Sequence, residues 1–160
     1  MYAITGANGF IGKHLTSYFR ERDIPYRSIG RDSKNVDFKI KELSRDTNWE
    51  EAFEGVEVIF HLAAKVHEIN NSKNNDLSLY LKNNFEATKK LISDACKVGV
   101  KKIIFLSTIK VNGEKTEFGF PFNFESSPNP QNAYAISKYK AEKILIKYGL
   151  ERNIDFTIVR

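Results

Sequence analysis

YAITGANGFIG, residues 2–12, is the stretch of sequence that decides the fold. A short apolar run ends abruptly at Gly6, and apolar residues then recur every three or four positions from Ile11 to Phe19, which predicts a strand at Tyr2–Thr5, a tight turn and a helix. The GxxGxxG spacing permits a sharp turn and close backbone approach, and the free N–H groups of the following helix attract a diphosphate. The stretch therefore predicts a dinucleotide-binding turn, with a turn that holds no ligand as the alternative.

The rest of the chain alternates apolar segments of strand length with helical patterns. Further strands are predicted at Tyr26–Ile29, Val56–Ala64, Ile103–Leu106 and Phe156–Val159, and long helices at Leu77–Ala95 and Tyr134–Leu150. Strands that are apolar on both faces belong to a parallel sheet, and the helices between them imply right-handed crossovers. The pattern predicts an α/β, Rossmann-type, doubly wound parallel sheet in three layers.

Composition excludes several classes of function. The 160 residues, 41% of them hydrophobic, suffice for one domain. Cys96 is the only cysteine, so an intramolecular disulfide is impossible, and the absence of ligand spacing predicts no metal site. The net charge of +5 is scattered rather than arranged in a basic stripe, which argues against nucleic acid. No apolar run approaches the roughly 20 residues that span a bilayer, and nothing resembles a signal peptide, so the expected location is the cytoplasm.

The end of the second predicted strand bears on the type of dinucleotide. An acid about 20 residues beyond the glycine turn normally binds the ribose hydroxyls of NAD. Here Gly30 and Arg31 occupy that place, and a guanidinium suits a 2′-phosphate, so NADP is favoured over NAD. Two alternatives stay open: Arg31 as an exposed cation that stacks on adenine, and Asp32 as the acceptor for a ribose hydroxyl.

Tyr134 and Lys138 form a YxxxK pattern on a predicted helix. Residues four apart share a helix face, and an ammonium beside a phenol favours its ionised form, which makes tyrosine a usable proton donor and acceptor at neutral pH. The strand before this helix ends in Ser107 and Thr108, at the sheet edge where open α/β sheets bind ligands. The alternative is an exposed pair on a lysine-rich helix. The long segment Asn112–Gln131 lacks either period and predicts a functional loop, in which the phenylalanines at 118, 120, 122 and 124, like Trp49 elsewhere, are expected to pack.

Several short motifs, in their order along the chain, resemble the extended short-chain dehydrogenase/reductases, and among these the nucleotide-sugar epimerases, dehydratases and reductases. The motifs are Thr5–Gly12, His61–Ala64, Asn84 with Thr88, Phe105–Thr108 and Tyr134–Lys138. The resemblance extends from Met1 to Arg160, and the joint pattern is far more specific than any single motif.

The resemblance implies a role for each matching residue. Gly6, Gly9 and Gly12 would hold the pyrophosphate with Phe10 and Ile11 beside it; Glu42, Leu43, Leu62, Ala63 and Ala64 would surround the adenosine; and Asn84 would support the site. Glu42 replaces the aspartate usual in the family. Thr108 would bind the reacting sugar hydroxyl, Tyr134 would be the general acid/base, and Lys138 would contact the nicotinamide ribose and Tyr134.

The residues after Thr108 indicate the reaction. Sugar 4,6-dehydratases resemble one another in placing an acid shortly after this position, whereas Ile109 and Lys110 follow here, which disfavours elimination. The resemblance then implies hydride transfer at C4 of a nucleotide sugar, as in UDP-sugar 4-epimerases. The alternatives are an NADP-dependent 4-keto-sugar reductase and a non-catalytic NADP-binding regulatory module.

The resemblance also bears on domain organisation. Family members continue into a substrate-binding lobe, so residues 1–160 are expected to be the cofactor domain, truncated before that lobe, which binds dinucleotide but turns over little alone. Family dimers often pair through two long helices, which correspond here to Asp76–Val98 and Tyr134–Leu150.

Overall fold

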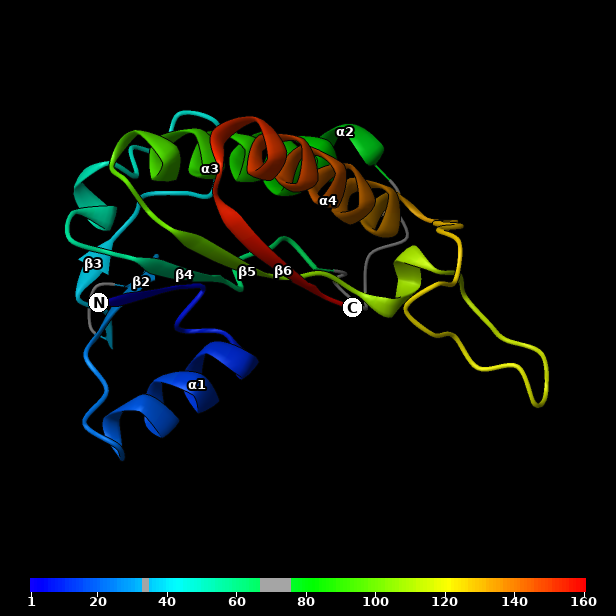
Figure 1. The fold of residues 1–160 in the computed structure, drawn as a ribbon, viewed down its shortest axis with the longest axis horizontal. Helices are drawn as coiled ribbons and strands as arrows, with labels where there is room; N and C mark the ends of the chain where they lie inside the picture. Colours follow the sequence, from blue (N-terminus) through cyan, green and yellow to red (C-terminus); the bar gives the residue numbers. More distant parts are fainter. Residues whose placement is uncertain (33–34, 67–75) are drawn as a thin grey trace.

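The computed structural model describes residues 1–32, 35–66 and 76–160 and contains a parallel sheet of six strands in the order β3-β2-β1-β4-β5-β6 (Figure 1). The strands are β1 (Tyr2–Thr5), β2 (Tyr26–Gly30), β3 (Phe38–Lys39), β4 (Val58–His61), β5 (Lys102–Leu106) and β6 (Asp155–Val159). β1 lies between β2 and β4, so the chain reverses its direction of winding at this strand. The carboxyl end of β1 is therefore the place where a doubly wound sheet binds ligands.

Helices lie on both faces of the sheet (Figure 1). One face is covered by α1 (Phe10–Arg20), and the other by α2 (Leu77–Tyr80), α3 (Ala87–Lys97) and α4 (Ala133–Arg152). A six-residue π-helix, η3 (Leu81–Glu86), joins α2 to α3, and the short 3₁₀ turns are η2 (Glu51–Phe53) and η4 (Ile109–Val111). The predicted three-layer, doubly wound fold is confirmed. Within the described ranges, no helix has the length and apolarity to cross a membrane.

One strand was not predicted, and two elements differ from their predicted form. β3 has only two residues, too few to produce a period, and pairs with β2 through Phe38. The predicted strand at Val56–Ala64 is shorter, because β4 pairs with β5 only as far as His61, after which the chain leaves the sheet. The predicted helix over 77–95 contains the π-helix, which changes the face that its side chains present.

The hydrophobic core has one part on each face of the sheet. The larger part lies between the sheet and α3 and α4 and includes Trp49, Phe53, Leu91, Ile103 and Leu145. The smaller part lies under α1 and is built on Ile4, Ala7 and Phe19. Trp49 is fully buried and stacks on Phe53 with ring centroids 5.3 Å apart, so its predicted packing is confirmed.

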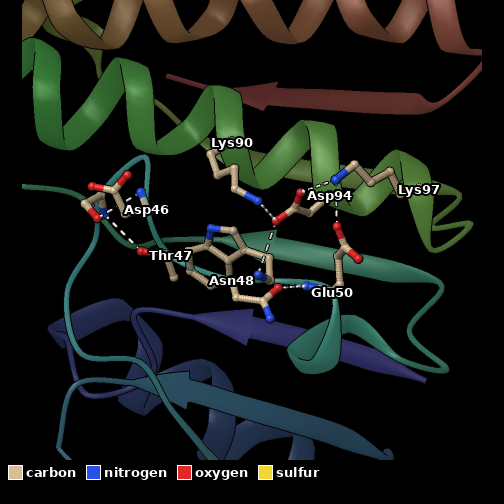
Figure 2. Close-up of polar contacts among 9 residues, drawn as sticks. Asp46, Thr47, Asn48, Glu50, Lys90, Asp94 and Lys97 are labelled. Carbon is tan, nitrogen blue, oxygen red and sulfur yellow. Dashed lines mark hydrogen bonds and ion pairs between the residues drawn. The ribbon is translucent and has the colours of Figure 1, made fainter.

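Asp94, fully buried on α3, ties the segment that precedes η2 to the helix layer (Figure 2). Its carboxylate accepts from the backbone N–H of Trp49 at 3.3 Å and from the ammonium groups of Lys90 and Lys97. Lys97 also bonds Glu50 at 2.6 Å. A buried carboxylate with three donors fixes this segment far more firmly than exposed ion pairs do.

The loop between η4 and α4 contradicts one expectation. Phe118, Phe120 and Phe124 are exposed, and only Phe122 is half-buried, against Gly113. The prediction that all four pack within the loop was wrong for three of them. The loop extends away from the body of the domain, so these rings have no layer to pack against (Figure 1).

Candidate functional site

A cavity of about 620 Å³ opens at the carboxyl ends of β1, β2 and β4. It is lined by Gly6, Asn8, Gly9, Gly30, Arg31, Asp32, Ile40, Glu42, Leu43, Leu62, Ala63, Ala64, Lys65, Val66, Leu79 and Asn83. These residues come from the loops after three neighbouring strands, from the segment after β3, and from α2 and η3. The volume and the position match those of a small-molecule or cofactor site in an open α/β sheet.

Gly6 and Gly9 line the cavity at the turn after β1, and Gly12 packs directly behind them. Gly6 has φ +73°, and a methyl group there would lie 2.7 Å from the Ala63 backbone nitrogen. A methyl group at Gly12 would lie 2.2 Å from the Gly6 carbonyl oxygen, so α1 begins directly against the turn. Gly9, the N-cap of α1, has no side chain to occupy the first N–H groups of the helix. The turn therefore offers backbone donors to an anion.

The end of β2 carries the residues that the sequence predicts to distinguish ribose from ribose phosphate. Gly30 is the last residue of β2, and a side chain there would collide with the Asn8 amide oxygen, 2.0 Å from the added atom. Arg31 and Asp32 follow, both exposed and both on the cavity wall. A guanidinium and a carboxylate thus stand side by side at the predicted ribose position.

The cavity brings together eight of the predicted cofactor residues: Gly6, Gly9, Arg31, Glu42, Leu43, Leu62, Ala63 and Ala64. Six predicted cofactor residues are not among the residues that line it: Phe10, Ile11, Gly12, Asn84, Tyr134 and Lys138. Phe10 and Ile11 are exposed on the first turn of α1. Lys65 and Asn83 line the cavity without having been predicted. The signal for Lys65 was its place directly after the His61–Ala64 motif, whereas Asn83 reaches the cavity because of the π-helix.

Asn84, also on the π-helix, connects the cavity wall to α4. Its side chain is buried, accepts from the backbone N–H of Lys65 at 2.7 Å and donates to the Lys65 carbonyl at 3.0 Å. It also donates to the Ser137 hydroxyl at 3.0 Å. Asn84 therefore connects the end of the β4 loop to the helix that carries Tyr134 and Lys138.

His61 links β1, β4 and α3 beneath the cavity. Its ring is fully buried and bonds the Thr5 hydroxyl at 2.7 Å and the Thr88 hydroxyl at 2.9 Å. Burial, helped by the positive charge of Lys138, lowers the pKa of His61 to about 3. The ring is therefore neutral at physiological pH and acts as a hydrogen-bonding spacer.

Acid is expected to destabilise the domain through His61. The unfolded imidazole binds a proton below pH 6.5 and the folded one only near pH 3, so stability present above pH 6.5 is lost as the pH falls, by about 1.4 kcal/mol per pH unit. Denaturant unfolding at pH 6.5 and 5.0 should show that His61→Gln removes about 2 kcal/mol of this pH dependence. The control is His14→Gln on the exposed face of α1; an unchanged pH slope in His61→Gln would contradict the assignment.

Tyr134, in the first turn of α4, lies near Thr108 at the carboxyl end of β5, close enough for the Thr108 hydroxyl to act on its pKa. Its ring packs edge-on against Tyr80 at 6.1 Å. Burial, together with the neighbouring Tyr80, raises the pKa of Tyr134, and the Thr108 hydroxyl opposes that rise. The expected lowering was wrong, because burial outweighs the favourable contacts; the phenol is protonated at neutral pH.

Lys138 lies one turn further along α4 and is only 2% exposed. Its ammonium nitrogen sits 3.8 Å from the centroid of the Phe105 ring, a cation–π contact. Burial lowers the pKa of Lys138 to about 7, and the negative charge of Glu142 opposes the shift. The exposed-surface alternative for the YxxxK pattern is therefore wrong: Lys138 is a buried, titratable group beside the sheet edge.

Comparison with known proteins agrees with this geometry. Residues 2–160 match the model of one protein family. The chain belongs to the NAD dependent epimerase/dehydratase family. The UDP-glucose 4-epimerase of Vibrio cholerae, a relative in this family, is 33% identical over 162 residues, which cover 98% of this chain and 49% of the relative.

Solved structures of epimerases share the fold. The UDP-glucose 4-epimerase of Thermus thermophilus, in complex with NAD, superimposes with a TM-score of 0.86 at 23% identity over 99% of this chain and 54% of that one. The UDP-glucose 4-epimerase of Thermotoga maritima, with UDP-glucose, gives 0.82 at 26% identity over 99% and 54%. The chain thus spans about half the length of the epimerases it matches.

Proposed function

We propose that this chain is the dinucleotide-binding part of an NAD(P)-dependent epimerase that acts at C4 of a nucleotide sugar. The observation that carries the proposal is the proximity of Tyr134 to Thr108 at the same sheet edge as the glycine-lined cavity. The cavity suits a dinucleotide because the turn after β1 presents backbone donors where a side chain would collide. The relatives that bind NAD and UDP-glucose support the choice of ligands.

Each residue then has a defined task. Gly6 and Gly9 bind the pyrophosphate, and the loop at Leu62–Ala64 packs on the adenosine. When bound, the nicotinamide supplies the hydride acceptor and donor for C4 of the sugar. Thr108 orients the sugar hydroxyl, and Tyr134 exchanges its proton. In the structure the phenol is protonated, which is the state that donates to a C4 oxygen when the alcohol is re-formed.

A dehydratase is less well supported. Ile109 and Lys110 follow Thr108 in η4, and Lys110 pairs with Glu114 at 3.2 Å. Elimination of water needs an additional acid/base residue at this position, and neither Ile109 nor a lysine engaged by a carboxylate is that acid. Hydride transfer at C4 without elimination is the chemistry that the remaining residues support.

Arg31→Ala is expected to weaken NADP binding about tenfold, or 1.4 kcal/mol, and to leave NAD affinity nearly unchanged. The reason is that the exposed Arg31 guanidinium lines the cavity at the end of β2, and a guanidinium binds a phosphate group well. Calorimetric titration of the chain with both dinucleotides measures the effect, and Arg45→Ala, an exposed arginine paired with Asp46, is the control. Equal losses for NAD and NADP would contradict a phosphate-reading role, and no binding of either dinucleotide would overturn the proposed function itself.

The proposal also states which function residues 1–160 perform by themselves. Because the chain spans about half of its relatives, we expect residues 1–160 to bind dinucleotide without epimerising UDP-glucose. The measurement is conversion of UDP-glucose by the chain alone with added NAD. Robust conversion would show that the substrate site is complete within these residues.

A further inference from the structure

A buried carboxylate that the proposed chemistry does not use lies directly behind the Thr108 end of β5. Glu142, on α4, is fully buried, and both of its oxygens are engaged. Oε1 accepts from the Ser107 hydroxyl and from Arg160 Nε at 3.0 Å, and Oε2 accepts from Arg160 Nη2 at 2.6 Å. A two-pronged arginine contact to a buried carboxylate sets position and orientation together.

This cluster joins elements that are distant in sequence. Ser107 immediately precedes Thr108, and its backbone N–H donates to the Val159 carbonyl at 2.7 Å. Arg160 follows β6 and also donates to the Asn112 side chain at 3.5 Å. Glu142 stands one helical turn after Lys138 and two turns after Tyr134. One carboxylate therefore connects the ends of β5 and β6 to the helix that carries the candidate catalytic groups.

We propose that Glu142 and Arg160 are the positioning pair of this site. The pair fixes the end of β5, with Ser107 and Thr108, relative to α4, so that Thr108 lies beside Tyr134. The inference rests on the proposed function, since it names the residues that assemble the same site. Glu142 and Arg160 touch neither substrate nor cofactor in this scheme. They act through Ser107 and through the rigidity of a fully satisfied buried pair.

The pair also acts on the pKa of Lys138, through the negative charge of Glu142. Among the described residues, the charged and titratable groups that act on the Lys138 ammonium are Glu142 on its own helix, His61 from β4 and, through Glu142, Arg160 directly after β6; the Phe105 ring of β5 lies beneath it. Glu142 is the anion among them whose charge raises the pKa of Lys138. Removing Glu142 and removing Arg160 must therefore shift Lys138 in opposite directions.

The test is an NMR titration of the 160-residue chain without any dinucleotide, following the lysine side-chain signals against pH. Glu142→Gln is expected to lower the midpoint of Lys138 by about one pH unit, a tenfold change in its acid constant, because the favourable anion is lost. Arg160→Gln is expected to raise it, because the charge of Glu142 is no longer compensated. Glu151→Gln, an exposed glutamate on the same helix paired with Lys147, is the control and should leave the midpoint unchanged. Midpoints that move the same way in both variants would overturn the proposal, since general loosening of the fold does that.

A second readout tests positioning without changing charge. Ser107→Ala removes only the serine hydroxyl that donates to Glu142, so the titration midpoint of Lys138 should not change. The ¹³C signal of the Tyr134 ring carbon that bears the phenol oxygen should shift, because the contact between Tyr134 and Thr108 is disturbed. This variant keeps the test decisive if Glu142→Gln fails to fold. An unchanged Tyr134 signal in both Ser107→Ala and Arg160→Gln would overturn the inference. Loss of dinucleotide binding in the native chain would instead overturn the proposed function and leave these measurements intact.

Discussion

Gly12→Ala is expected to weaken dinucleotide binding at least about 100-fold, or 2.7 kcal/mol. The added methyl group would lie 2.2 Å from the Gly6 carbonyl oxygen and 2.8 Å from the Ala7 Cα, and both are backbone atoms that cannot rotate away. α1 must then move off the turn, which misplaces the N–H donors at its start. Overpacking of this kind also costs about 1–3 kcal/mol of folding stability.

Calorimetric titration with NAD measures the affinity, and thermal unfolding followed by circular dichroism shows that the variant still folds. Ser17→Ala, an exposed change on the same helix, should leave both quantities unaltered. Native affinity in folded Gly12→Ala would mean that the ligand does not sit on the turn after β1, and the assignment of the whole cavity would then fall.

If the proposed function holds, Tyr134→Phe is expected to reduce epimerase turnover by about 10²–10⁴-fold in a protein that contains these residues together with a substrate-binding lobe, while NAD affinity stays within about twofold. The substitution removes the hydroxyl that lies near Thr108 and exchanges the sugar proton, but it keeps the ring that packs on Tyr80. The measurement is conversion of UDP-glucose at saturating substrate, paired with an NAD titration.

Tyr148→Phe, a half-buried tyrosine near the other end of α4, is the matched control and should retain turnover. Equal activity of Tyr134→Phe and the native protein would contradict the acid/base role. A full-length protein with no turnover to lose, but with NADP affinity, would instead favour the regulatory-module alternative.

The sequence predicted the parts of this molecule that depend on local pattern. The strand–turn–helix at residues 2–20 and the buried strands follow from spacing and apolarity, and they fix the sheet edge where the cavity opens. The cavity residues at Leu62–Ala64 were predicted from a family motif rather than from hydrophobic periodicity. β4 ends at His61, and no pattern within the apolar run marks that point.

Features that depend on contacts between distant segments were not predictable. The direction of the Tyr134 pKa shift is set by how deeply α4 presses the phenol against Tyr80, which spacing on one helix does not specify. The buried pair Glu142–Arg160 joins residues 18 apart in sequence that each look like ordinary surface charges. The exposed rings of Phe118 and Phe124 show the converse, since an aromatic residue in a loop is not evidence that the loop packs.

Trp49 is the only tryptophan of the chain. It is buried, stacks on Phe53, and donates its backbone N–H to Asp94 of α3. An indole without water around it fluoresces at shorter wavelength than one in solvent, so the emission of this protein comes from a single, known place. The wavelength of the emission maximum therefore reports whether water has entered the core between the sheet and α3.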